Sequence, residues 1–193
     1  MSMLAIPFGR GETFYAGRTI DASSLQGDDF LGITRTFNDI NATTRTKNTG
    51  LYCVAVLLRN LSGGTLFAKE AIQFSGTVPA QATSGKTSAA NQLFAVVDEY
   101  LPAIGVPAND IFWAVVKGPT TAKFVTVSGA KSAGQLLVGS SSTAGKLDFI
   151  STSPGSATIA QNAAVYGRAF TEGAIANAAE EARVYLTSPF FGC

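Results

Sequence analysis

The residue types that most often carry catalysis are absent or isolated in this chain. Its 193 residues include no histidine, which is the commonest general base and a frequent metal ligand. Ser-His-Asp and Cys-His catalysis and histidine-based metal sites are therefore excluded. Carboxylates remain, in the adjacent pairs Asp28 with Asp29, Asp98 with Glu99, and Glu180 with Glu181. Because adjacent acids arise by chance in most chains, these pairs do not by themselves indicate a glycosidase.

Two short motifs resemble reactive sites but lack essential parts. Ala82–Ser88 (ATSGKTS) resembles a phosphate-binding loop, but Ala80 stands where such a loop needs its first glycine. Ser128–Lys131 (SGAK) has the spacing by which a neutral lysine activates a serine, yet the neighbouring glycines favour a β-turn between strands. We expect no catalytic residue, no metal ligand and no cofactor.

The overall composition excludes several classes of partner. Apolar residues make up 46% of the chain and charged residues 14%, with a net charge of +1, so the basic surface of a nucleic-acid-binding protein is not expected. The longest apolar runs, Cys53–Leu58 and Ile111–Val116, are too short to span a bilayer as helices. The N-terminus lacks the pattern of a secretory signal, and the two cysteines, Cys53 and Cys193, fit a reduced compartment. We expect synthesis in the cytoplasm, and no disulfide between them.

Short apolar segments separated by glycine turns predict a mainly β fold, a compact β-barrel or β-sandwich. The pattern is clearest between Asp110 and Thr187. Leu51–Asn60 and Thr65–Phe74 flank the turn sequence LSGG and are predicted to form a β-hairpin. The first of these segments is apolar on both faces, which indicates burial from both sides. By the same reasoning we interpret Trp113 as a core residue rather than a sugar-stacking platform.

One short helix and two extended terminal arms complete the predicted architecture. Apolar residues recur at three- and four-residue steps between Thr87 and Leu101, which predicts an amphipathic helix that covers the hairpin and ends at Pro102. Residues 1–50 are rich in Gly, Thr, Asp and Asn and read as a loop-rich arm. We therefore divide the chain into an arm, residues 1–50, and a β-rich body, residues 51–193.

Five residues in the two arms are the candidates for a partner interface. Arg35, Arg45 and Lys47 make the N-terminal arm locally basic, which fits either a solvated arm or docking on an acidic partner. Phe190 and Phe191 lie in the C-terminal SPFFGC segment, where they either fill the protein's own core or pack against a neighbour.

Five segments of the chain carry a family resemblance: VAVLLRNLSGGTL, DIFWAVVKGPTTAKF, GQLLVGSSSTAGKL, AAVYGRAFTEG and ARVYL. Over Leu51–Thr187 they resemble the successive elements of capsid decoration, or cement, proteins of tailed bacteriophages. The resemblance implies a small β-barrel or β-sandwich body, often a homotrimer, on the exterior of the virion. It implies contacts with the major capsid protein and reinforcement of the shell, without catalysis. The long region before Leu51 and the predicted helix depart from the smaller members of that family.

Three functions follow from these observations. The first is a structural virion protein that binds the outer surface of a phage capsid and stabilises the major capsid protein lattice. The second is a carbohydrate- or cell-surface-binding β-sandwich module of a fibre or adhesin, in which Trp113 would be the main contact residue. The third is another structural subunit, such as a minor capsid protein.

Overall fold

The structure, a computed structural model, describes residues 10–11, 13–14, 31–40, 44, 46–74, 81–84, 94–140, 142–150 and 169–187. Within these ranges the fold is mainly β, as predicted, and contains no helix. The strands are β1 Thr13–Phe14, β2 Thr34–Ile40, β3 Lys47–Asn60, β4 Ala71–Phe74, β5 Gln81–Ser84, β6 Phe94–Val97, β7 Ile111–Lys123, β8 Leu137–Gly139, β9 Leu147–Phe149, β10 Ala169–Thr171 and β11 Glu181–Leu186.

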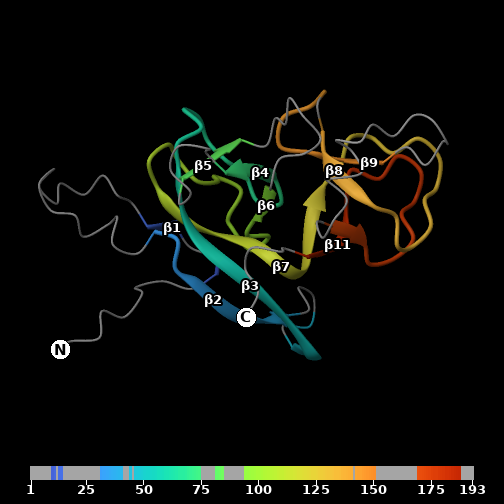
Figure 1. The fold of residues 1–193 in the computed structure, drawn as a ribbon, viewed down its shortest axis with the longest axis horizontal. Helices are drawn as coiled ribbons and strands as arrows, with labels where there is room; N and C mark the ends of the chain where they lie inside the picture. Colours follow the sequence, from blue (N-terminus) through green and yellow to red (C-terminus); the bar gives the residue numbers. More distant parts are fainter. Residues whose placement is uncertain are drawn as a thin grey trace, which may run out of the picture.

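Five of these strands close on themselves to form a small barrel. Each strand of the series β3, β7, β6, β4 and β5 pairs with the next, and β5 returns to β3 in parallel. The other strands extend this ring: β2 pairs with β3, β1 with β7, and β10 with β11, which itself pairs with β7. Figure 1 shows β2 and β3 running side by side away from the ring, with the separate β8–β9 pair next to β11.

Strands β3, β4, β6 and β7 bury side chains on both faces, as predicted for the apolar segments at 53–58 and 111–116. The inner cluster contains Val54, Val56, Leu58, Leu66, Ile72, Ala95, Val97, Leu101, Val106, Phe112, Ala114 and Val116. Because its members come only from ring strands and their connecting loops, this cluster fills the ring. The outer cluster includes Cys53, Leu57, Val96 and Trp113, and continues through β11, β8 and β9.

The predicted hairpin between Leu51–Asn60 and Thr65–Phe74 is wrong. β3 pairs with β2, β5 and β7, whereas β4 pairs with β5 and β6. Buried Asn60 anchors the loop that follows β3. Its side-chain amide donates to the carbonyl oxygens of Gly64, Val106 and Pro107, at 2.8, 2.9 and 3.0 Å. These bonds fix the loop against the β6–β7 connection instead of against β3.

The predicted helix at Thr87–Leu101 is wrong for Phe94–Val97, which forms strand β6; residues 85–93 lie outside the described ranges. Ala95 and Val97 belong to the inner cluster, while Val96 belongs to the outer one. A strand that is buried on both faces is apolar at consecutive positions, so it also satisfies the three- and four-residue spacing of a helix. Loop residues, including Leu66 and Val106, occupy the position predicted for the helix.

Part of the predicted N-terminal arm belongs to the barrel assembly. Thr34–Ile40 forms β2, and β3 already begins at Lys47, so the prediction of a loop-rich arm is wrong for these residues. In β2, Phe37 is half-buried and Asp39 is fully buried. A strand with only two inward side chains carries too short a period-two pattern to stand out among polar residues. The predicted C-terminal arm, residues 188–193, lies outside the described part of the chain.

Candidate interaction surface

Among the described strands, β2 stands at one end of the strand order of the sheet. It pairs with β3 on one side, with Arg35 opposite Ala55 and Phe37 opposite Cys53. The Leu57 N–H donates to the Ile33 carbonyl at 2.9 Å. In an antiparallel pair the hydrogen-bonding direction alternates along the strand, so the N–H groups of Thr34, Thr36 and Asn38 point away from β3. An edge of this kind is a template for a strand from a partner.

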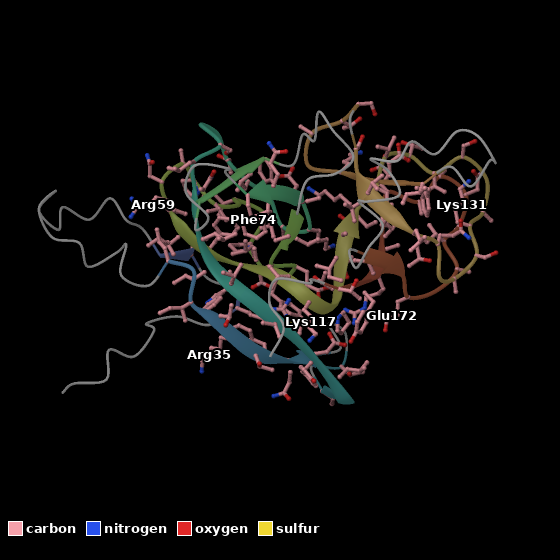
Figure 2. All side chains as sticks on the ribbon, viewed as in Figure 1. Arg35, Arg59, Phe74, Lys117, Lys131 and Glu172 are labelled. Carbon is pink, nitrogen blue, oxygen red and sulfur yellow. The ribbon has the colours of Figure 1, made fainter. Side chains whose placement is uncertain are left out.

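Of the five predicted interface residues, the structure places one side chain. Arg35 is exposed on β2, and its guanidinium carbon lies 5.5 Å from the centre of the Phe37 ring. Figure 2 shows Arg35 at the outer edge of this strand. Lys47 is the first residue of β3 and pairs with Ile40, but its side chain is outside the description. Arg45, Phe190 and Phe191 also fall outside the described residues, so Arg35 alone can be assigned to a surface.

A second surface lies at one end of the ring, where two loops carry exposed apolar side chains. Ile104 is 77% exposed and Phe67 is 42% exposed. The loops are joined by a bridge between Leu66 and Val106, whose backbones exchange hydrogen bonds of 3.0 and 2.7 Å. A Cβ on Gly105 would lie 3.1 Å from Phe67 Cδ1, so the two loops are in close contact. We call Phe67 and Ile104 the ring-end patch.

Buried charges hold an N-terminal residue on the outer face of the barrel. The guanidinium of Arg10 donates from Nε to Asp98 Oδ1 at 2.8 Å, and the Gly11 N–H donates to Asp98 Oδ2 at 2.5 Å. The same guanidinium lies 4.4 Å from the centre of the Tyr100 ring and 3.2 Å from Cys53 Sγ. The side chains of Arg10 and Asp98 are 7% and 1% exposed. We call Asp98, Glu99, Tyr100 and Cys53 the Arg10 site.

A second guanidinium continues this network across the sheet. Arg183 on β11 lies 2.8 Å from Asp39 Oδ2, 3.1 Å from Glu172 Oε2 and 3.5 Å from Glu99 Oε1. Glu99 also lies 3.6 Å from Arg10 and accepts a 2.6 Å hydrogen bond from Thr121. Each of these carboxylates therefore faces a guanidinium. The arrangement joins β2, the β6–β7 loop and β11, and it is typical of a structural ion-pair network rather than of an acid–base pair.

Burial shifts the pKa values of the groups around Arg10. Burial raises the pKa of the Cys53 thiol to about 11, although the charge of Arg10 lowers it. Burial also raises the pKa of Tyr100, with a further contribution from the charge of Glu99. For Arg10, burial lowers the pKa, but Asp98 and other nearby groups raise it, and the net value lies above the ordinary one. The thiol is thus protonated at neutral pH, which is the form of a core residue and not of a nucleophile.

Of the two motifs that resemble reactive sites, Ser128–Lys131 is described in full, whereas only residues 82–84 of the other are described, as part of β5. The chain bends at Ser128 and Gly129, where Gly129 has φ of 73°, and the Lys131 ammonium lies 5.6 Å from the Phe149 ring centre. The described residues contain no group of three or more His, Cys, Asp or Glu side chains placed to hold a metal ion. Trp113 is 1% exposed, so the prediction that it is a core residue is confirmed.

Sequence reasoning did not find the Arg10–Asp98 pair. In the sequence Asp98 is one of two adjacent acids, and its position directly after the apolar run Ala95–Val97 is the signal of a buried charge that needs a partner. That partner lies 88 residues away along the chain, and no local pattern connects the two.

No protein-family model matches the sequence, and no curated protein matches it. In the part of the chain that the structure describes, no helix is suited to spanning a lipid bilayer.

Proposed function

We propose that this chain is a structural protein of a bacteriophage virion that binds the exterior of the capsid and stabilises the lattice of the major capsid protein. The observation that carries the proposal is the contrast between the buried charged groups and the surface of the fold. The buried carboxylates and guanidiniums hold the barrel and its flanking strands together, while the surface offers a strand edge and apolar loops. Such a molecule is equipped to bind through surface area rather than to perform chemistry.

The open edge of β2 supports a specific mode of binding. An extended segment of the partner would pair with Thr34–Asn38 and gain main-chain hydrogen bonds, with Arg35 selecting for a nearby acid. The ring-end patch, Phe67 and Ile104, would add apolar area on another part of the body. The carbohydrate-binding alternative is less well supported, because its main contact residue, Trp113, lies in the core.

The experiment compares capsids of the virus that encodes the chain, prepared with and without the protein. We expect the protein to bind at stoichiometric sites and to raise the temperature at which the shells rupture, measured by light scattering. The matched variants are Thr36→Pro, which removes an outward N–H of β2, and Thr36→Ala, which keeps it. We expect Thr36→Pro to lower occupancy and Thr36→Ala to leave it near that of the native chain. Equal rupture temperatures with and without bound protein would contradict the proposal.

A further inference from the structure

Arg10 and Gly11 attach to the barrel as a small, separate unit. Two donors of the guanidinium and one backbone N–H contact the single carboxylate of Asp98, and the Tyr100 ring covers the cation. Beyond this contact, strand β1 pairs Thr13 with Phe112 and Phe14 with Ile111, and the Thr13 side chain hydrogen-bonds to Asp110. The Arg10 site therefore recognises a guanidinium followed by a peptide N–H, which is the chemistry of an Arg-Gly segment.

The site is assembled by the body of the protein, without help from Arg10. The Asp98 N–H donates to the Trp113 carbonyl at 3.2 Å, and the Tyr100 N–H donates to Asp98 Oδ1 at 3.4 Å. The Tyr100 hydroxyl donates to the Ile40 carbonyl at 2.7 Å, which fixes the ring that covers the cation. The site therefore keeps its shape whether the arginine comes from the same chain or from another.

An empty Arg10 site would be unfavourable. Asp98 is 1% exposed, and loss of Arg10 would leave it beside Glu99 with no cation of its own. Removing one partner of a buried ion pair typically costs several kcal/mol, because the other charge stays buried and uncompensated. The native segment is thus expected to leave this site only when an equivalent segment replaces it.

The connection that follows the segment is long enough to allow such a replacement. Residues 15–30 lie between Phe14 and Leu31, which precedes β2, and a stretch of that length can reach about 50 Å when extended. A body of this size has a radius of gyration of about 16 Å. The Arg10–Phe14 segment can therefore reach the corresponding site of an adjacent copy.

We propose that the Arg10 site is a receptor for an Arg-Gly segment, and that adjacent copies of the chain exchange their Arg10–Phe14 segments through it. The exchange is a form of domain swapping, in which identical contacts are made between chains instead of within one. It rests on the proposed function in one respect: assembly on a capsid brings copies close enough to exchange. The site itself is a property of the isolated chain and is tested without capsids.

The first test uses the full-length Arg10→Ala variant, whose site is vacant, and a fluorescent peptide of residues 7–16, PFGRGETFYA. We expect saturable binding, measured by fluorescence anisotropy. We expect it to weaken at least ~10-fold when alanine replaces the arginine of the peptide, or when Asp98→Asn is added to the protein, because a charge-assisted contact is lost. Circular dichroism confirms that the variants are folded. Equal affinity for all these combinations of peptide and protein, or no binding of the peptide to folded Arg10→Ala, would contradict the proposal that the site is a receptor.

The second test detects exchange between chains. Arg10→Glu and Asp98→Arg each break the pair, but a mixture of the two variants can restore both pairs across chains. We expect a mixed dimer by native mass spectrometry that neither variant forms alone, while the double variant in one chain regains stability as a monomer. If the peptide binds but the mixture contains no mixed dimer, the proposed exchange between chains is wrong. If the reversed charges prevent folding, Arg10→Ala is mixed with the native chain instead. Binding of the native Arg10–Phe14 segment to the Arg10→Ala chain then tests the exchange.

Discussion

At the scale of residues, burial decides which groups are reactive. Cys53, Tyr100 and Asp98 gather around one guanidinium, and each is positioned by the outer face of the barrel. The Cys53 thiol is fully buried and has a pKa of about 11, above the ordinary value of 9.0. Its hydrogen-bond partner is Arg10 rather than a general base, so the thiol contributes to packing and not to chemistry.

The raised pKa of Cys53 predicts a loss of stability at alkaline pH. Between pH 9 and about 11 the unfolded chain loses the thiol proton while the folded chain keeps it. The folded state then binds more protons, so the free energy of unfolding decreases as the pH rises. At about 1.4 kcal/mol per pKa unit, the loss approaches ~3 kcal/mol at the upper end of this window and is absent below pH 9.

Urea unfolding of the native chain and of Cys53→Ala between pH 8 and 10.5 measures this effect. The variant starts with lower stability because it leaves a small cavity, but we expect its stability to fall less steeply across the window. Other groups, including Tyr100, titrate in both proteins and cancel in the comparison. Parallel curves for the two proteins would contradict the assignment.

At the scale of elements, β7 is the strand that connects the parts of the fold. It pairs with β3 from Ile111 to Lys117 and with β11 from Gly118 to Lys123. The change of partner falls at Gly118, which has φ of 93° and lies against β3. A Cβ at this position would meet the Tyr52 carbonyl oxygen at 2.5 Å and the Cys53 Cα at 2.8 Å. Glycine is therefore required for β3 and β11 to share β7.

We predict that Gly118→Ala is strongly destabilising, while Gly129→Ala is only mildly so. Both glycines have positive φ, which costs alanine about 1–2 kcal/mol. A Cβ on Gly129 meets nothing within 4 Å, whereas a Cβ on Gly118 overlaps backbone atoms. The difference between the two variants in free energy of unfolding thus measures the overlap, and we expect at least ~2 kcal/mol. Similar values for both would show that β3 and β7 separate easily.

At the scale of the whole molecule, charge is scarce, and part of it is gathered in one ion-pair network. The net charge is +1, and charged residues make up 14% of the chain. Four carboxylates, Asp39, Asp98, Glu99 and Glu172, face two guanidiniums in one network. The outside offers a strand edge and the ring-end patch, so an interface made by this molecule depends mainly on main-chain hydrogen bonds and apolar contact.

This distribution predicts that the proposed binding to capsids is insensitive to salt. Raising the NaCl concentration from 0.1 to 1 M shortens the Debye length to about 3 Å. We nevertheless expect the dissociation constant to change less than ~5-fold, since few surface charges take part. Co-sedimentation with capsids at both concentrations measures the change. Arg35→Gln is the control, because it removes the one predicted interface cation that the structure places. If binding is lost at high salt, and Arg35→Gln causes a similar loss at low salt, the interface is electrostatic instead.

Composition and the pattern of neighbouring residues were sufficient to predict several features of this protein. The absence of histidine excluded whole classes of catalytic site, and runs of apolar residues identified the buried strands at 53–58 and 111–116. Trp113 was assigned to the core for the same local reason. These inferences hold because exposing an apolar run to water is unfavourable, so the run becomes buried whichever strand lies next to it.

The pairing of the strands and the contacts between charged groups became known from the three-dimensional fold. The apolar spacing at Phe94–Val97 fits a helix as well as a strand, and pairing with β4 and β7 selected the strand. Asn60 anchors the loop that follows β3, where a hairpin was expected. Arg10 and Asp98, 88 residues apart, form their contact because the barrel brings the β6–β7 loop to the N-terminal segment. Such pairings depend on contacts between distant parts of the chain, which local sequence patterns do not encode.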